Sequence, residues 1–366
     1  MKLPITGLAN SGKTTIFNAL TGVGHPPSLY IIKDMEPQRA TVKVPDRRLE
    51  GLAEIFRPRK VTNATVEYID FIGLTKGDLL QNRKVFDMIK DADAIVHVIR
   101  AFRDEAVVHP LGSVDPLRDM ETVEFEFIFG DLELVTKRLQ RIEEAKKKGK
   151  KHQEEEVKTL LKCKEALEQE RPLRFVDFSE EELKILRPMQ FLSDKPEVIV
   201  FNTDEKMNPM EIEALIRSAI DYYKRFSPAY EEKVKIISLS GKIERELSQM
   251  SPDEQKEFLK ELGIDEPALN KLIRVSYGLL RYISFFTVGE DEVRAWTIRE
   301  GTNAQKAAGK IHSDMERGFI RAEVVSYEDF IKEGSLSALR DKGLLRLEGK
   351  DYIVKDGDII NFRFNV

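Results

Sequence analysis

An eight-residue stretch near the start of the chain combines glycines, a lysine and a threonine at a spacing that suits phosphate binding. Residues 7–14 read GLANSGKT, a complete G-x-x-x-x-G-K-[ST] pattern. The glycines allow backbone N–H groups to turn inward around phosphate oxygens. Lys13 can then reach the β- and γ-phosphates, and the Thr14 hydroxyl can ligate Mg²⁺. Average residue usage puts a chance match in a chain of this length on the order of 1%, so we predict a phosphate-binding loop.

A second group of polar residues follows an apolar run. Asp70 and Gly73 form a D-x-x-G sequence directly after the strand-like residues 66–69. Downstream of a phosphate-binding loop, such an aspartate can hold Mg²⁺ through water, and the glycine N–H can sense the γ-phosphate. The sequence therefore predicts that Lys13, Thr14, Asp70 and Gly73 carry the catalysis, with Thr14 and Asp70 as metal ligands.

Two later polar stretches could contact the base of a nucleotide. Asn202-Thr203-Asp204-Glu205 stands where GTPases carry N-K-x-D, and Ser240-Gly241-Lys242 stands where S-A-K usually lies. In N-K-x-D the aspartate accepts hydrogen bonds from the N1–H and N2–H₂ groups of guanine, whereas adenine presents an acceptor at N1 and a donor at N6. Glu205 in place of that aspartate, with the neutral Thr203 in place of the lysine, weakens the prediction of guanine without proving adenine.

Strand-like and helix-like segments alternate around these motifs, as a site assembled from them requires. Residues 3–5 are apolar, and residues 15–20 open like a helix. Further short apolar runs typical of buried parallel strands lie at residues 66–69, 94–99, 198–201 and 234–237. Parallel strands joined by helices form a doubly wound sheet that binds ligands at its carboxyl edge. The expected fold class is therefore α/β, with a doubly wound P-loop NTPase sheet.

A long insertion separates two of the predicted strands. Apolar residues recur in it at helical spacing, first at Leu132, Val135, Leu139 and Ile142 and then at Val157, Leu160, Leu161 and Leu167. Two such stripes on either side of the lysine-rich residues 146–151 predict an antiparallel helical hairpin with a basic tip, to which Lys137, Arg138 and Arg141 add charge. A solvated charge run and contact with RNA phosphates are equally weighted interpretations of this tip.

The composition excludes several classes of protein. The chain has 366 residues, with 59 lysines and arginines against 64 aspartates and glutamates and a net charge of −5, which argues against a surface that coats nucleic acid throughout. A single cysteine, Cys163, rules out an intrachain disulfide. No apolar run reaches the ~18–20 residues that span a bilayer, and the N-terminus shows no signal-peptide pattern. We expect a cytoplasmic protein of several domains that does not bind membranes.

Other conspicuous side chains are expected to be structural. The histidines show no metal-ligand spacing, and His97 lies in a strand-like run that favours the core. Trp296 is expected to be buried, and Cys163 is expected to be inert. The histidines are His25, His97, His109, His152 and His312.

Several of these motifs, together with further ones, resemble one family, the YchF/Obg-like ATPases. The resemblance covers essentially the whole chain. Residues 70–77 resemble the family's D-x-x-G-L-x-K-G, and residues 115–121 its DPxRDIE. Residues 91–100, 202–205 and 240–244 are similar to its fourth strand, its base-contacting motif and its SAKIE. The C-terminal matches resemble the family's TGS domain, a small β-grasp fold; they lie at residues 284–287, 294–298, 318–324 and 350–358.

The resemblance implies a slow ATPase that also accepts GTP, binds ribosomes and uses Mg²⁺. It places the phosphates on residues 10–15 and implies that the Thr203 backbone helps to hold the base. It also implies hydrolysis without the usual switch glutamine, because Leu74 follows Gly73. A potassium ion near Asn10 or a partner molecule would then orient the water. The nucleotide-binding residues expected are Asn10, Ser11, Gly12, Lys13, Thr14, Thr15, Asn202, Thr203, Glu205, Ser240, Gly241 and Lys242.

Three departures from the family pattern qualify these expectations. Asp34 stands where the family has a switch threonine; a carboxylate can ligate Mg²⁺, so Asp34 joins Thr14 and Asp70 as a predicted metal ligand, but its charge weakens the expectation of switch closure. The segment at residues 78–82 is shorter than in the family, and the loop reads N-S-G-K-T-T instead of N-V-G-K-S-T. Nucleotide binding follows from the sequence; fast hydrolysis does not.

The sequence thus predicts a division into domains and one leading function. A P-loop domain covers residues 1–110 and 190–280, a coiled-coil insert covers 111–189, and a TGS β-grasp domain covers 281–366. The leading function is hydrolysis of ATP, or of GTP, as a conformational switch of a monomer on the ribosome or its RNA. A nucleotide-gated binding module with negligible turnover and an ordinary GTPase remain alternatives. A P-loop kinase for a small substrate ranks well below them.

Overall fold

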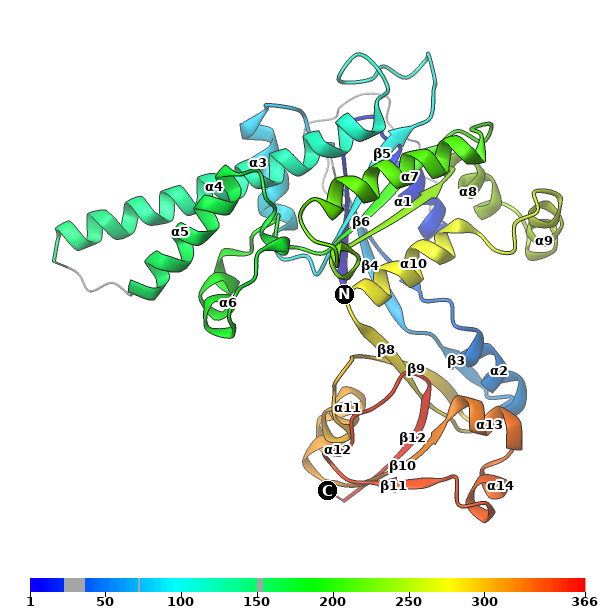
Figure 1. The fold of residues 1–366 in the computed structure, drawn as a ribbon. Helices are drawn as coiled ribbons and strands as arrows, with labels where there is room; N and C mark the ends of the chain where they lie inside the picture. Colours follow the sequence, from blue (N-terminus) through cyan, green and yellow to red (C-terminus); the bar gives the residue numbers. More distant parts are fainter. Residues whose placement is uncertain (23–36, 72, 150–153, 366) are drawn as a thin grey trace. The chain divides into compact units, whose positions relative to one another are not determined.

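A computed structural model of the chain describes residues 1–22, 37–71, 73–149 and 154–365. These residues form two compact units (Figure 1). The first consists of Met1–Thr41 and Glu67–Leu272, and the second of Val42–Val66 and Ile273–Val366. No helix among the described residues is long and apolar enough to cross a membrane.

The first unit is built on a six-stranded sheet in the order β2-β4-β1-β5-β6-β7. Strands β1, β4, β5, β6 and β7 pair in parallel. All seven residues of β5 and of β6 are buried, which explains why both strands appear in the sequence as mainly apolar runs. The bounds are β1 Lys2–Thr6, β2 Gln38–Lys43, β4 Thr65–Asp70, β5 Ile95–Ala101, β6 Glu197–Thr203 and β7 Val234–Leu239. The predicted doubly wound α/β sheet is confirmed.

Helices connect these strands and begin at local capping signals. Helix α1 starts at Lys13, directly after the loop glycine Gly12, and α8 starts after Ser240, whose hydroxyl accepts a hydrogen bond from the Ile243 N–H. The helices of the sheet are α1 Lys13–Thr21, α3 Leu79–Ile89, α7 Pro209–Lys224, α8 Gly241–Ser248, α9 Pro252–Glu261 and α10 Ala268–Leu279, with a short 3₁₀ turn at Tyr230–Glu232.

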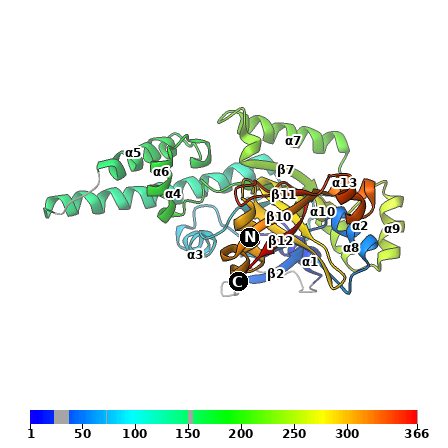
Figure 2. The same ribbon diagram turned by 90° about the horizontal axis from the view of Figure 1, so that it is seen from below.

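The insertion forms two helices that run side by side, α4 at Pro116–Lys147 and α5 at Glu154–Glu168 (Figures 1 and 2). We call them the helical arm. The predicted hairpin is therefore present, but its apolar stripe differs at one position, because Leu161 is 51% exposed and Cys163 is fully buried. Around them lie the 3₁₀ turns Leu173–Phe175 and Arg187–Met189 and helix α6, Glu180–Leu186.

The basic charge predicted for the arm is partly neutralised. Arg138 pairs with Glu156 of α5 at 2.6 Å, and Lys147 pairs with Glu143 one turn away at 3.0 Å. Residues 150–153 of the predicted tip lie outside the described residues. The paired positions contribute less free positive charge than the sequence suggests.

The second unit contains a mixed sheet in the order β11-β10-β12-β8-β9-β3. Strand β12 is parallel to β8, and the pairs β8–β9, β10–β12 and β10–β11 are antiparallel. A β-hairpin, a crossing helix and a central parallel strand in this order form a β-grasp fold, as the sequence predicts. The strands are β3 Lys60–Thr62, β8 Tyr282–Thr287, β9 Glu292–Arg299, β10 Phe319–Ser326, β11 Arg346–Glu348 and β12 Asp358–Phe364, and the helices are α2 Arg47–Phe56, α11 Ala304–Ile311, α12 Ser313–Arg317, α13 Tyr327–Glu333 and α14 Leu336–Asp341.

An N-terminal segment contributes to this second unit. Strand β3 pairs with β9, and Thr62 donates a hydrogen bond to Glu292 at 2.6 Å. Arg48 of α2 pairs with Asp356 at 2.8 Å. The sequence-based ranges place these residues with the P-loop domain, whereas the contacts group Val42–Val66 with the C-terminal residues. Partners more than 200 positions apart leave no local pattern that a sequence reading could detect.

Candidate functional site

The glycine-rich loop connects β1 to α1 and is held closely by its neighbours. Gly7 has a φ of 140°, and an added Cβ would overlap the carbonyl oxygen of Val98 in β5. Gly12 has a φ of 93°, and a Cβ there would overlap the side-chain amide of Asn202. Both positions therefore require glycine for conformation and for space, which explains two fixed positions of the sequence motif.

Lys13, Thr14 and Asp70 come together at the carboxyl ends of β1 and β4. The Lys13 ammonium donates to the carbonyl oxygen of Leu8 at 2.7 Å, and the Thr14 hydroxyl donates to Asp70 Oδ2 at 2.7 Å. Burial lowers the pKa of Lys13 to about 8, against the attraction of Asp70. Burial also raises the pKa of Asp70, while its hydrogen bond from Thr14 acts in the opposite direction. The two charges are thus held out of water without a direct ion pair in the described chain.

The D-x-x-G segment lies directly against the loop. A Cβ on Gly73 would come within 2.6 Å of the Ala9 backbone nitrogen and 2.9 Å of Lys13 Nζ. The Leu74 N–H donates to the Gly7 carbonyl at 2.9 Å, and Leu74 is fully buried. The structure therefore brings all four predicted catalytic residues to one place.

The donor atoms around Asp70 fit a hard divalent cation. Asp70 Oδ1 is buried and has no hydrogen-bond partner in the part of the chain that the structure describes. It stands beside the Thr14 hydroxyl, and oxygen ligands of this kind are those that Mg²⁺ prefers. No group of three or more His, Cys, Asp or Glu residues that could hold a metal ion occurs among the described residues, so phosphate and water oxygens would complete the coordination. Asp34, the third predicted ligand, lies outside the described residues.

The predicted base-contacting residues meet at the ends of β6 and β7. Asn202 Nδ2 donates to the Ser11 carbonyl at 3.0 Å, and Asn202 Oδ1 accepts from the Gly241 N–H at 2.9 Å. The Thr203 hydroxyl donates to the Leu239 carbonyl at 3.2 Å. Asn202 therefore links the phosphate loop to the segment of residues 240–242. Beyond it, Lys242 Nζ lies 2.9 Å from Glu205 Oε1.

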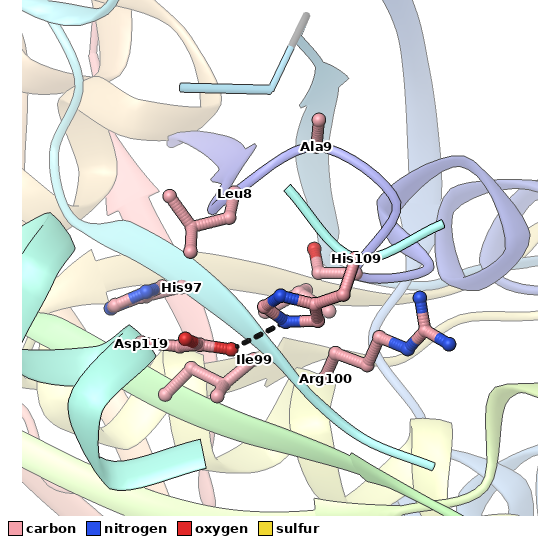
Figure 3. A pocket seen from close by; sticks show the side chains of 9 residues that line it. Leu8, Ala9, His97, Ile99, Arg100, His109 and Asp119 are labelled. Atoms are coloured by element: carbon pink, nitrogen blue, oxygen red, sulfur yellow. Dashed lines mark hydrogen bonds and ion pairs between the residues drawn. The ribbon is translucent and has the colours of Figure 1, made fainter. Parts of the chain in front are cut away.

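His109, which the sequence predicts to be structural, lies beside the phosphate loop (Figure 3). A crevice there is lined by Leu8, Ala9 and Ser11 of the loop, by residues 97–100 of β5, and by His109 and Asp119. His109 Nδ1 accepts from the Leu111 N–H at 3.1 Å, so Nε2 carries the proton and donates to Asp119 at 2.8 Å. The available signal was its position in the loop that follows β5, since parallel strands end at the ligand edge.

Two side chains hold the segment that follows β5 and carries His109. Arg100 donates to the carbonyl oxygens of Phe102, Asp104 and Val107. Asn10, which has a φ of 61°, donates from Nδ2 to the Val108 carbonyl at 2.9 Å. The segment that carries His109 is therefore tied both to β5 and to the phosphate loop.

A second set of buried charges lies where the arm joins the sheet. We call it the arm-root cluster: His97, Glu124, Arg174, Glu197 and Tyr223, all buried. Arg174 Nη1 lies 2.8 Å from Glu124 and 3.2 Å from Glu197. His97 Nδ1 lies 3.0 Å from Glu197, and Tyr223 donates to Glu124 at 3.3 Å. Burial raises the pKa of Glu124 to about 7, against the attraction of Arg174. The prediction that His97 belongs to the core is confirmed.

The remaining two predictions concern Trp296 and Cys163. Trp296 is half-buried, packs on Phe285 and lies under Arg294, whose guanidinium carbon is 3.8 Å from the ring centroid. Its indole N–H donates to Thr287 at 2.9 Å. The expected burial of Trp296 is therefore only partial. Burial raises the pKa of Cys163 to about 12, which keeps the thiol protonated and unreactive.

Known proteins share both the sequence and the fold of this chain. Residues 2–126 match the family profile described as "50S ribosome-binding GTPase", and residues 282–365 match YchF-GTPase_C, described as "Protein of unknown function (DUF933)". "Ribosome-binding ATPase YchF" of Bacillus subtilis is 42% identical over 99% of this chain and 98% of that protein. The Haemophilus influenzae protein of the same name is 40% identical over 100% and 99%.

The likeness extends to three dimensions. The solved structure of the Schizosaccharomyces pombe YchF GTPase superposes with a TM-score of 0.80 at 30% identity, over 99% of this chain and 97% of that one. Sequence relatives, both family profiles and this structure therefore point to the same family. The chain belongs to the YchF family of P-loop nucleotide hydrolases.

Proposed function

We propose that this chain is a Mg²⁺-dependent ATPase that also accepts GTP and acts as a conformational switch on the ribosome. The convergence of Lys13, Thr14, Asp70 and Gly73 on the phosphate loop carries the proposal. The names of the relatives, which describe ribosome-binding ATPases, support the same activity and partner. The location proposed is the cytoplasm, and the working form proposed is a monomer.

Each residue at the phosphate end has a distinct role in this proposal. Lys13, which turns to the Leu8 carbonyl in the structure, moves to the β- and γ-phosphates and stabilises the charge that develops there. Thr14 and Asp70 hold Mg²⁺, with Asp34 as a third proposed ligand, and the bound ion neutralises phosphate charge. The Gly73 N–H responds to the γ-phosphate. Loop residues 10–15, namely Asn10, Ser11, Gly12, Lys13, Thr14 and Thr15, surround the phosphates.

The base end of the proposed site uses the two linked strand ends. Asn202 fixes the geometry through its bonds to Ser11 and Gly241. The backbone at Thr203 and the segment Ser240-Gly241-Lys242 flank the base, and Glu205 faces its edge. The Thr203 side chain is hydrogen-bonded to Leu239, so it does not replace the lysine that covers guanine in N-K-x-D.

Water activation needs a group other than the residue after Gly73. Leu74 is apolar and fully buried, so it cannot orient a water molecule. We propose a potassium ion beside Asn10, whose side-chain nitrogen donates to Val108 and whose amide oxygen is the atom suited to a cation. The test compares the rate of ATP hydrolysis in K⁺ and in Na⁺, with Asn10→Ala as the control variant. Equal rates would exclude the potassium ion and leave a ribosomal group to orient the attacking water.

Leu74 also favours the second candidate, a nucleotide-gated binding module with negligible hydrolysis. Single-turnover measurements with ribosomes present distinguish the two functions, because the switch releases phosphate within one binding cycle and the module does not. We propose that the helical arm and the C-terminal unit contact the ribosome. This contact would recognise the shape and the charged phosphate backbone of the RNA and not its base sequence.

The nucleotide preference is tested by calorimetric titration of the nucleotide-free protein with ATP and with GTP, both with Mg²⁺. We expect tighter binding of ATP by the wild type. Glu205→Asp, which restores the acid of N-K-x-D, is expected to shift the preference towards GTP. Tighter GTP binding by the wild type would identify an ordinary GTPase instead.

A further inference from the structure

An ion pair joins the two segments that flank the proposed base position. Lys242 Nζ lies 2.9 Å from Glu205 Oε1, and the two side chains are 67% and 31% exposed. The hydrogen bond from this ammonium also raises the pKa of Lys242 above its usual value. Both residues belong to motifs that the sequence analysis selected, but their direct contact was not predicted.

The backbone on both sides of the pair is fixed by buried hydrogen bonds. Asn202 accepts from the Gly241 N–H, one residue before Lys242, and Thr203 donates to the Leu239 carbonyl at the end of β7. Strands β6 and β7 are themselves paired in register as far as Asn202 and Leu239. The sheet therefore brings the two segments that carry Glu205 and Lys242 close together.

This contact matters for purine recognition because of the atoms it uses. A carboxylate recognises guanine by accepting from N1–H and N2–H₂ at the same time, one donor for each oxygen. In the structure the ammonium of Lys242 already donates to Oε1 of Glu205. Oε1 can still accept a second hydrogen bond, but the ammonium takes one of its acceptor positions and partly neutralises the carboxylate. The two guanine donors therefore gain less from Glu205 than they would from an unpaired carboxylate. Adenine has a single donor group on this edge, N6, beside an acceptor at N1, so it loses less than guanine to the ion pair.

We propose that Lys242 is a specificity-determining residue that disfavours guanine by occupying the carboxylate of Glu205. The inference rests on the proposed function, because it assigns the base edge to Glu205. The proposed role of Lys242 differs from the effect of the longer Glu205 side chain alone, because the preference for ATP over GTP then depends on two residues. It also makes the preference sensitive to ionic strength.

The expected size of the effect follows from the exposure of the pair. Ion pairs between exposed side chains are weak, and their strength corresponds to a change of about two- to fivefold in an equilibrium constant. Lys242→Met should therefore lower the ratio Kd(GTP)/Kd(ATP) by about two- to fivefold. Methionine retains the length of the side chain and removes only the ammonium.

Three further variants make the test specific. Lys206→Met removes the same charge from the loop of Glu205, and no ion pair involves Lys206 in the described residues, so its ratio should equal that of the wild type. Glu205→Gln removes the carboxylate. Adding Lys242→Met to Glu205→Gln should leave the ratio unchanged, because the lysine acts through the carboxylate. A lysine effect of equal size in both backgrounds would overturn the proposal.

A salt titration provides a second measurement without any variant. ATP and GTP carry the same phosphate charge, so screening of the phosphates cancels in the ratio, whereas screening of the pair does not. Between 50 mM and 500 mM salt the wild-type ratio should fall towards the value of Lys242→Met, and the ratio of that variant should stay constant. Parallel changes in both proteins would contradict the inference.

The outcomes separate this inference from the proposed function. If the wild type binds neither nucleotide, the proposed function fails and the ratio is undefined. If both nucleotides bind and the ratio is the same in the wild type, Lys242→Met and Lys206→Met, the function stands and the role of Lys242 is wrong. A higher ratio in Lys242→Met would mean that the lysine assists guanine, which also overturns the proposal.

Discussion

The phosphate loop and the arm-root cluster both remove charged side chains from water, but they treat those charges differently. At the arm root, Arg174 forms ion pairs with Glu124 and Glu197, so opposite charges neutralise one another inside the protein, although Arg174 Nη2 and Glu197 Oε2 have no hydrogen-bond partner among the described residues. At the loop, the buried Lys13 donates to a neutral carbonyl, and Asp70 keeps a buried oxygen without a hydrogen-bond partner among the described residues.

Displaced pKa values occur in both regions and do not distinguish them. The pKa of Lys13 is lowered to about 8 and that of Glu124 is raised to about 7, in each case mainly by burial. The difference is whether protein groups neutralise the charge or leave it for a ligand. We therefore expect substitutions at the arm root to change stability and substitutions at the loop to change activity.

The largest expected effect is on stability, at Arg174. Arg174→Met leaves two buried carboxyl groups without their cation, and breaking a buried pair in this way costs about 3–5 kcal/mol of unfolding free energy. Urea denaturation measures the loss. Arg138→Met, which removes a partly exposed pair with Glu156 on the same arm, should cost less than about 1 kcal/mol. Equal losses in the two variants would show that the arm-root cluster does not hold the arm.

Lys13→Met should produce the opposite pattern. Loss of a positioned charge at the phosphates lowers kcat by about 10²–10³-fold, whereas the protein without nucleotide loses little stability because no opposite charge was paired with the ammonium. Steady-state ATP hydrolysis and thermal denaturation of the same preparation measure both quantities. A variant that melts early and keeps its turnover would reverse the distinction between the two regions.

Asp70→Asn should weaken the response to metal. Replacing a group that orients metal ligands typically costs 10–100-fold in metal affinity, and the amide retains the volume and the hydrogen bond from Thr14. Titration of ATP binding with Mg²⁺ should show this loss, while ATP binding without metal changes little. If Mg²⁺ enhances binding equally in the variant and the wild type, Asp70 does not serve the metal.

The smallest effects are pH slopes of stability in the protein without nucleotide. The folded pKa of Glu124, about 7, lies above its usual 4.5, so the folded state binds the extra proton between these values and stability falls as pH rises through that window. Lys13, at about 8 instead of 10.5, gives the reverse, a rise in stability between pH 8 and 10.5. Each slope is at most about 1.4 kcal/mol per pH unit.

Two variants assign these slopes. Glu124→Gln should make the fall between pH 5 and 7 smaller. The part that remains comes from other carboxyl groups whose pKa burial raises, namely Asp131, to about 6, and Asp70, Glu244 and Asp358. Lys13→Met should remove the rise above pH 8 and leave the acidic limb unchanged. Denaturation curves at several pH values test both, and an unchanged profile in Glu124→Gln would assign the acidic limb elsewhere.

The sequence was informative where neighbouring residues impose the geometry. The phosphate loop could be predicted because its glycines, Lys13 and Thr14 lie within eight residues, and the strands because full burial gives mainly apolar runs. The arm-root cluster could not, because Glu124, Arg174 and Glu197 are far apart in the chain and carry no pattern. The helical spacing of apolar residues also predicted, wrongly, that Leu161 packs between the two helices of the arm. Cys163 is buried there instead, and a pattern of large apolar residues does not reveal this.

The contact between Lys242 and Glu205 illustrates the same limit at the site itself. Each residue was selected by its own motif, but their proximity depends on the register of β6 and β7. His109 was missed for a related reason, because its relation to the phosphate loop passes through Asp119 and the segment after β5. Sequence motifs identify the residues at the ends of strands, but the order and register of the strands determine which of these residues are in contact.

The assignment of Val42–Val66 to the second unit has a consequence for biosynthesis. Strand β3 emerges early, but its partner β9 follows far later in the chain, since Lys60 pairs with Glu292. At translation rates of about 5–20 residues per second, the segment waits on the order of 10–50 seconds for its partner. During that time α2 lacks the surroundings that bury Leu49 and Leu52. A chain truncated before β9 retains this exposed helix, so removing the C-terminal residues does not yield a self-contained nucleotide-binding domain.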